Sequence, residues 1–387
     1  MHDDEFRRAV RAWLAENVSD ELRGAGGPGR EHEAYRERLA FDRRLAAAGW
    51  TCLGWPVEHG GRGATLAQQV AFHEEYARAG GPARVGHLGE ELLGPTLIAY
   101  GTPAQRRRFL PRIRAVEELW CQGYSEPGAG SDLAAVATRA RLVGDEWVID
   151  GQKVWTSLAH VADWCFLLAR THSPGTGPRQ AGLSYLLVPM RQPGVTVRPI
   201  RQLTGTSEFN EVFFAGARTS RDMVVGEVGQ GWRVAMGTLT FERGAATLGQ
   251  QVGFQRELDA LVSLARHRGV AGEPQVRDTL TRAFIGLWAL RAHTTLHTMT
   301  EVDGQGPGQG ASAVKLLWSR WHQRLGELAM QVRGASGAVA RDAPYDLDEW
   351  QRLFLFSRAD TIYGGSDEIQ RGIIAERVLG LPRQARG

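Results

Sequence analysis

Residues that could bind a flat polar ligand are concentrated in the middle of the chain. The sequence Glu-Pro-Gly-Ala-Gly at 126–130 cannot form the interior of a helix, because proline lacks a backbone donor and two glycines follow it. It predicts an open loop that exposes backbone N–H groups and the hydroxyls of Ser125 and Ser131. Trp155 and the hydroxyl of Ser157 follow on a predicted strand. A Gly-Pro loop by itself is compatible with an ordinary connection, but the combination predicts a planar ring held between a polar loop and an aromatic wall.

Four separated motifs, in order, resemble those of the acyl-CoA dehydrogenase family. The stretch 125–132 and the Trp-Thr-Ser at 155–157 resemble the mid-chain signature of the family. They are flanked by Trp-Pro-Val-Glu-His-Gly-Gly at 55–61 and Glu-Ile-Gln-Arg at 368–371. The resemblance covers nearly the full length and implies an FAD-dependent α,β-dehydrogenation of an acyl thioester. The implied fold is α+β, with an N-terminal helical domain, a middle antiparallel β domain and a C-terminal four-helix bundle.

The same resemblance implies the flavin contacts of the middle domain residue by residue. Tyr124 and Ser125 are expected to meet the edge of the ring through backbone and hydroxyl groups. Ser131 is expected to lie toward the pyrophosphate, and it is also a candidate substrate contact. Trp155 is expected to back the isoalloxazine, with Ser157 near its N5 atom.

Further cofactor contacts are implied in the C-terminal part. Ser366 matches a threonine that touches the cofactor, and it also suits the N-cap of a final helix. The run from Gln331 through Gly334 to Ala335 resembles the segment that reaches the adenine end of FAD bound to a neighbouring subunit, although the Gly-Ala-Ser-Gly at 334–337 also suits a helix stop. Arg268 is a possible match to an arginine that approaches the pyrophosphate across the dimer. The aromatic residue of the family's Arg-x-x-Phe-Gly is absent from the Arg-Gly-Val-Ala-Gly at this position.

The catalytic base departs from the common family pattern. Most members carry a glutamate in a Tyr-Glu-Gly-Thr motif, where this chain has Tyr-Gly-Gly-Ser with Gly364 at the base position. A relocated base, a different flavin chemistry and an inactive subunit are the three explanations. A minority of the family place the glutamate just before an arginine on an earlier helix, and Glu242 followed by Arg243 matches that arrangement.

Glu242 is therefore the candidate α-proton base, and Arg243 is a candidate substrate contact. An ion pair between Glu242 and a neighbouring arginine is the alternative interpretation. The other carboxylates that could serve as the base are Glu126, Asp360 and Glu368.

Hydrophobic periodicity divides the chain into three units. Residues 1–115 have helical spacing, residues 116–225 have the period and turns of a small β domain, and residues 226–387 return to long helices. The expected helices of the last unit, at about 231–268, 274–301, 311–333, 347–362 and 367–379, suit a four-helix bundle.

Local signals predict two features within these units. Thr102 is expected to cap a helix that has Pro103 at its first position. The sequence Trp-Val-Ile, Asp-Gly, then Lys-Val-Trp at 147–155 predicts a β-hairpin that turns at Asp150 and Gly151.

Composition limits the class of protein. The chain has 387 residues and a formal net charge of +3, which is too small to indicate nucleic-acid binding. Its three cysteines lack metal-ligand spacing, so no metal site is expected. The acidic N-terminus lacks the apolar region of a signal peptide, and no apolar run reaches the length of a membrane span. We expect a cytoplasmic protein that does not enter a membrane.

The resemblance also implies partners and leaves two other functions open. An acyl-CoA or a carrier-protein thioester is the expected substrate, and an electron-transferring flavoprotein is the expected acceptor. A homotetramer or homodimer is expected, and the incomplete Arg-x-x-Phe segment keeps a heterotetramer possible. The alternatives are a flavin monooxygenase of the same fold and a non-catalytic partner subunit of a heteromeric dehydrogenase.

Overall fold

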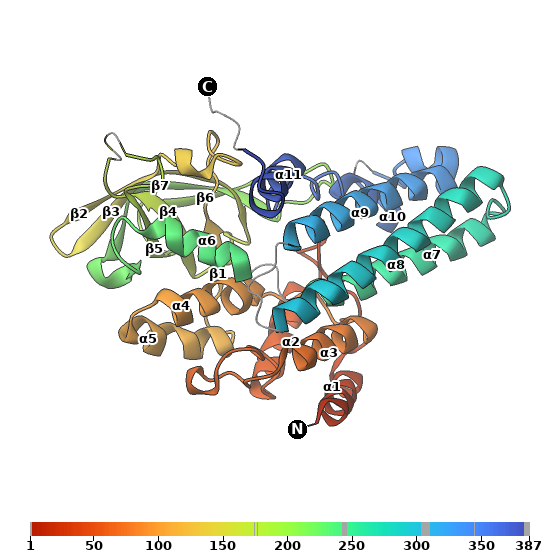
Figure 1. Cartoon of the computed structure of the whole chain (residues 1–387), viewed down its shortest axis with the longest axis horizontal. Helices are drawn as coiled ribbons and strands as arrows, with labels where there is room; N and C mark the ends of the chain where they lie inside the picture. Colours follow the sequence, from red (N-terminus) through yellow and green to blue (C-terminus); the bar gives the residue numbers. More distant parts are fainter. Residues whose placement is uncertain are drawn as a thin grey trace.

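The computed structural model of the chain describes residues 2–173, 175, 177–241, 246–302, 310–343 and 345–382. The sheet formed by the middle of the chain lies beside two groups of helices, one from each end of the sequence (Figure 1). This arrangement confirms the predicted α+β fold. The domain limits stay a prediction.

The N-terminal helices begin where the sequence supplies caps. Thr65 and Thr102 each form a capping box, in which their side chains accept hydrogen bonds from the backbone N–H of Gln68 and Gln105. Pro103 occupies the first position of its helix, as predicted. The elements are α1 (Asp3–Asn17), α2 (Tyr35–Ala47), the 3-10 turn η1 (Val57–His59), α3 (Leu66–Arg78), the π-helical turn η2 (Leu88–Leu93), α4 (Gly94–Tyr100) and α5 (Pro103–Arg114).

The described strands form a single eight-stranded sheet in the order β6-β7-β3-β2-β4-β5-β8, with β1 paired to β4. Most neighbours are antiparallel, but β1 and β2 each run parallel to β4. The strands are β1 (Trp120–Gly123), β2 (Arg139–Val143), β3 (Glu146–Ser157), β4 (Trp164–Arg170), β5 (Leu183–Pro189), β6 (Val195–Pro199), β7 (Phe209–Ser220) and β8 (Val224–Val225). Short 3-10 turns, η3 (Leu133–Ala135) and η4 (Arg221–Met223), connect some of them.

The predicted hairpin at Asp150 and Gly151 is wrong. Both residues lie inside the continuous strand β3, and β3 pairs instead with β2 through a turn before it. The Asp150 carboxylate accepts a hydrogen bond of 2.8 Å from the backbone N–H of Gly216, which lies at a bulge in β7. A Cβ atom at Gly151 would lie 2.5 Å from the hydroxyl of Thr138, so this glycine permits a close approach of chains rather than a turn.

The C-terminal part is helical, and its longest helices run side by side (Figure 1). Helices α7 and α8 both contact α9, and their apolar faces share one core that contains Phe254, Trp318 and Trp321. The elements are α6 (Gly231–Phe241), α7 (Ala246–His267), α8 (Pro274–Val302), α9 (Ala311–Arg333), the 3-10 segment η5 (Gly334–Ala338), α10 (Glu349–Phe356), α11 (Asp367–Ile373) and the π-helical turn η6 (Ile374–Val378). None of the described helices is both long enough and apolar enough to cross a membrane.

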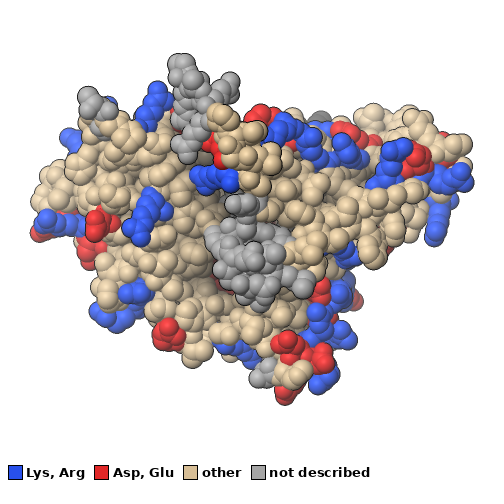
Figure 2. Space-filling view, in the orientation of Figure 1, with Lys and Arg blue, Asp and Glu red and all other residues tan. Residues whose placement is uncertain are grey.

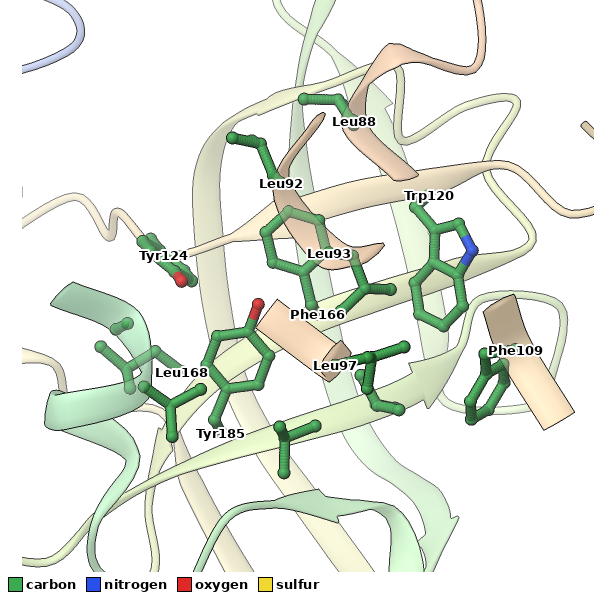
Figure 3. Packing of buried hydrophobic residues seen from close by; sticks show 14 of the residues in the cluster. Leu88, Leu92, Leu93, Leu97, Phe109, Trp120, Tyr124, Phe166, Leu168 and Tyr185 are labelled. Carbon is green, nitrogen blue, oxygen red and sulfur yellow. The ribbon is translucent and has the colours of Figure 1, made fainter. Parts of the chain in front are cut away.

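An apolar cluster joins the sheet to the N-terminal helices and to α6 (Figure 3). Phe166 of β4 and Tyr185 of β5 stack with their ring planes 3° apart. The ring of Tyr124 stands edge-on to both, at interplanar angles of 85° and 82°. Leu93 and Leu97 of the helices lie in the same cluster. This packing fixes the chain at the point where β1 ends and the candidate binding loop begins.

Candidate functional site

The loop after β1 closes on itself in a tight turn. The backbone N–H of Glu126 donates to the carbonyl of Ala129 over 3.1 Å, and the N–H of Ala129 donates back to the carbonyl of Glu126 over 3.0 Å. Between them lie Pro127 and Gly128, both exposed. A Cβ atom at Gly128 or Gly130 would meet nothing within 4 Å, so the outer side of this turn is open. The predicted loop is confirmed, and its open side has room for a ligand.

A buried ion pair attaches this loop to β3. The ammonium group of Lys153 is fully buried and donates to the carbonyl of Tyr124 (2.9 Å) and to the carboxylate of Glu126 (2.8 Å). That carboxylate also accepts from the backbone N–H groups of Ala137 (2.7 Å) and Thr138 (2.9 Å). All three interactions therefore hold one carboxylate in place.

The ion pair keeps both of its members charged. Burial alone would raise the pKa of Glu126, but the charge of Lys153 and the hydrogen bonds to the carboxylate outweigh it and lower the pKa. Burial lowers the pKa of Lys153, and the Glu126 carboxylate opposes that effect. Glu126 thus serves the architecture of the loop, and its carboxylate is not free to act as a base.

Trp155 presents its indole to the open side of the sheet beside the loop. Its backbone has a φ of 59°, in the left-handed region, where the pairing of β3 with β7 shifts register. The side chain is 58% exposed, and its ring stands edge-on to that of Phe209 at 6.3 Å. The backbone N–H of Val154 donates to the carbonyl of Ser125 over 2.9 Å, which ties the wall to the loop. Ser157 follows two residues later and is half-buried.

An unpaired buried amide shows that the site fits a polar ring. The Nε2 atom of Gln122 is buried and has no hydrogen-bond partner among the described residues. Gln122 and Tyr124 lie two positions apart and therefore on the same face of the chain as it leaves β1. A free amide donor, an open glycine turn and an exposed indole are the groups that the isoalloxazine of FAD would need. The residues present therefore fit the cofactor that the resemblance implies.

Sequence reasoning missed both Gln122 and Lys153. Alternation along the strand from Tyr124 is the signal that could have identified Gln122. For Lys153 no comparable signal exists, because a lysine in a strand is ordinarily exposed and only the pairing of β3 with the loop buries it.

Three of the predicted cofactor residues form a second group, away from the first. Arg268, just past the end of α7, donates to the hydroxyl of Ser336 over 3.3 Å. Gly334 follows the last residue of α9 with a φ of 58°, and Gln331 is exposed in the last turn of that helix. This group therefore lies where α7 ends, at the end of the bundle far from the sheet (Figure 1). The structure does not bring it to Trp155 within one chain.

The remaining predicted residues lie near the start of α11, in the loop after β1, or outside the described residues. Ser366 is the N-cap of α11, and its hydroxyl accepts from the backbone N–H of Ile369 over 3.4 Å. Ser131 is exposed in the loop after β1. Glu242 and Arg243 lie outside the described residues, in the stretch between α6 and α7.

The two other alternative carboxylates have different environments. Asp360 is 1% exposed and lies 2.6 Å from a ring nitrogen of His322, and it also accepts from the hydroxyl of Tyr363 over 2.7 Å. Glu368 is exposed in the first turn of α11, 3.7 Å from Arg371. Negative charge there is favoured by the helix dipole.

Family profiles match the chain over most of its length. The N-terminal domain of the acyl-CoA dehydrogenases matches residues 2–117, the middle domain matches residues 121–216, and the C-terminal domain matches residues 229–379. The chain is 65% identical to the acyl-CoA dehydrogenase IpdE1 of Mycobacterium tuberculosis over 387 residues, which is 99% of each chain.

Two solved structures have the same fold. The first, titled Tcur3481-Tcur3483 steroid ACAD, has a TM-score of 0.85 and 31% identity and covers 99% of this chain and 98% of that chain. The second, the ChsE4-ChsE5 complex from Mycobacterium tuberculosis, has a TM-score of 0.80 and 31% identity at the same coverage.

Proposed function

The chain belongs to the acyl-CoA dehydrogenase family, and on that premise we propose that it oxidises an acyl-CoA to the trans-2-enoyl-CoA with FAD as oxidant. One proton leaves Cα and one hydride leaves Cβ. The observation that carries the proposal is the loop after β1, which the buried Lys153–Glu126 pair holds beside the exposed indole of Trp155.

The residues of the loop after β1 and of the adjoining end of β3 each have a proposed part in holding the cofactor. Tyr124 and Ser125 offer backbone groups and a hydroxyl to the edge of the ring, and Trp155 covers it on one side. Ser157 would lie near the reacting edge of the ring, and Ser131 would lie toward the diphosphate. When bound, FAD supplies the acceptor for the hydride from Cβ at its N5 atom. The part of the chain would be to orient the ring.

Glu242 is our candidate for the base that takes the α proton. Gly364 stands at the position where most relatives have a glutamate, and it carries no group that could accept a proton. The buried carboxylates of Glu126 and Asp360 are engaged by Lys153 and His322. The dipole of α11 explains a negative charge at Glu368, in the first turn of that helix. A general base contributes typically about 10²–10⁴-fold to the rate. Arg243, next to the base, is our candidate for a contact to the thioester.

We further propose that a complete FAD site needs two chains. Arg268, Gln331 and Gly334 lie at the end of the bundle far from Trp155, which supports their binding the adenine end of a cofactor held by a neighbouring subunit. Ser366 would contact the cofactor of its own chain. A homotetramer is the default, and the missing aromatic residue beside Arg268 supports a heterotetramer as the alternative. The titles of both solved relatives name two chains.

The substrate is proposed to be a bulky acyl-CoA. One solved relative is titled a steroid ACAD, which supports a polycyclic or branched acyl group. An electron-transferring flavoprotein is the proposed acceptor of the electrons.

The proposal is tested with the purified chain and a panel that includes butyryl-CoA, isovaleryl-CoA and a steroid side-chain acyl-CoA. We expect a yellow protein that reduces an artificial electron acceptor with at least one of these substrates. Glu242→Gln should keep its flavin and lose about 10²-fold or more of the turnover. Glu368→Gln, an exposed carboxylate of the last helix, is the control and should keep most of it.

Other results would contradict the proposal. Normal turnover of Glu242→Gln would exclude the assignment of the base. Oxygen consumption driven by a reduced flavin, without acyl-CoA oxidation, would indicate a monooxygenase. A chain that binds no flavin alone or with a second chain would indicate a non-catalytic subunit.

A further inference from the structure

A histidine in the bundle connects three elements beneath the segment 361–366. His322 of α9 has its Nδ1 atom 2.6 Å from the carboxylate of Asp360 and its Nε2 atom 3.2 Å from the carboxylate of Glu257 on α7. Its imidazole is mostly buried and packs against the ring of Phe254 at 4.9 Å. One side chain thus joins α7, α9 and the chain that follows α10.

Asp360 in turn binds Tyr363. Its second carboxylate oxygen accepts a hydrogen bond of 2.7 Å from the Tyr363 hydroxyl. The ammonium group of Lys315 donates to the backbone carbonyl of Asp360 over 2.5 Å and lies 4.6 Å from the centre of the Tyr363 ring. Each oxygen of the Asp360 carboxylate therefore has a side-chain partner: His322 for one and Tyr363 for the other.

The segment that follows needs such support, because it contains two flexible residues. Gly364 and Gly365 have φ angles of 62° and 86°, and glycine populates this region without steric resistance. On the C-terminal side the amide of Gln370 donates to the carbonyls of Gly364 (3.0 Å) and Gly365 (3.4 Å). On the N-terminal side the Tyr363 hydroxyl donates to Asp360, and the Tyr363 ring packs against Trp318 and Phe356.

The segment also borders a cavity. Thr361, Ile362 and Ser366 line an open hollow of about 500 Å³ between this segment and α9. Gly364, in the middle of the segment, occupies the position that carries the base in most relatives, and Ser366 is a proposed cofactor contact. A shift of the segment would therefore move Gly364 and Ser366 relative to the proposed substrate and cofactor.

We propose that His322 is a positioning residue for the dehydrogenation: it fixes Asp360, Asp360 fixes Tyr363, and Tyr363 holds the 361–366 segment against the acyl thioester. This inference rests on the proposed function for the part that concerns substrate. The charge state agrees with the geometry: burial would lower the pKa of His322, but the hydrogen bonds and charges of Asp360 and Glu257 raise it to about 10, so the imidazole is charged near neutral pH.

Two substitutions at the same position separate positioning from packing. His322→Asn places an amide donor near the former Nδ1 and can still reach Asp360, whereas His322→Gln places it near the former Nε2 and can reach only Glu257. We expect His322→Asn to retain KM for the acyl-CoA within about threefold, and His322→Gln to raise it roughly tenfold or more, the equivalent of one lost charge-assisted hydrogen bond. Tyr363→Phe should reproduce the effect of His322→Gln. His172→Asn, at an exposed histidine in the loop after β4, is the control.

Hydrogen exchange of the amides in 361–366 measures the same link without catalysis. We expect exchange in this segment to accelerate roughly tenfold in His322→Gln and Tyr363→Phe, and much less in His322→Asn. Equal effects of the Asn and Gln variants, or unchanged exchange in His322→Gln, would overturn the proposal. An intact exchange pattern with no dehydrogenase activity in the wild-type chain would instead reject the proposed function and leave the structural link standing.

Discussion

At the scale of single residues, the shape of the loop after β1 depends on one buried ion pair. Glu126→Gln would leave the Lys153 ammonium buried beside a neutral amide, and breaking a buried pair on one side destabilises a protein by about 3–5 kcal/mol. We expect a loss of unfolding free energy of about that size and a loss of bound FAD. Urea unfolding followed by tryptophan fluorescence, together with the flavin content of the purified protein, measures both.

An exposed ion pair of the same strand supplies the control. Glu146 lies 2.7 Å from Arg218, and both side chains are about half exposed. Glu146→Gln should therefore change the unfolding free energy by less than about 1 kcal/mol and leave the flavin content intact. Equal losses in the two variants would show that the buried pair has no special part in the loop.

The residue types of the loop could be predicted from the sequence, but its attachment could not. A proline followed closely by two glycines favours an open turn, so the exposed loop beside Trp155 was predictable. The burial of Lys153 depends on which strand lies beneath the loop, and that is a tertiary property. The place of Glu242 relative to this loop lies outside the described residues and stays a prediction.

At the scale of elements, helix caps and long helices were predictable, whereas the path of the chain at Asp150 and Gly151 was not. Thr102, Pro103 and Ser366 act locally, and each occupies the cap or first-turn position that its chemistry indicates. Asp150 and Gly151 have the composition of a hairpin turn, but they meet a bulge in β7 and the approach of Thr138. Contacts with neighbouring strands override turn propensity there. The sequence pattern alone cannot distinguish a hairpin turn from a position inside a strand.

The packing of α7, α9 and the segment after α10 predicts a dependence of stability on pH. The groups that face His322 are Glu257 and Asp360, and Lys315 and Tyr363 surround Asp360. Because the pKa of His322 is raised from 6.5 in the unfolded chain to about 10 in the fold, its stabilising contribution is complete below pH 6.5. This contribution is lost as the pH rises toward about 10.

The unfolding free energies of the wild type and His322→Gln, measured by urea titration from about pH 6 to about pH 10, isolate this effect. We expect the difference between the two proteins to shrink across that range, because lysine and tyrosine titrations are common to both. A difference that is constant with pH would contradict a charged histidine in the folded protein.

At the scale of the whole molecule, the bundle presents an apolar face that no described element covers. Phe284, Ile285 and Trp288 project from one side of α8, and the indole of Trp288 is 62% exposed. Figure 2 shows few charged side chains on the surface over this part of the bundle. The exposed stripe, together with our proposal that Arg268, Gln331 and Gly334 serve the FAD of a neighbouring chain, favours an assembly.

Trp288→Asp tests whether that face is an interface. A carboxylate buried in an apolar contact without a partner is strongly unfavourable, so we expect the mass measured by light scattering after gel filtration to fall by at least about half. FAD content should fall with it if Arg268 and Gln331 belong to the site of a neighbouring chain. Leu142→Asp, at an exposed apolar position on β2, is the control and should leave both quantities unchanged. A Trp288→Asp protein with wild-type mass would show that α8 faces solvent, and a dissociated protein that kept all its FAD would place the complete cofactor site within one chain.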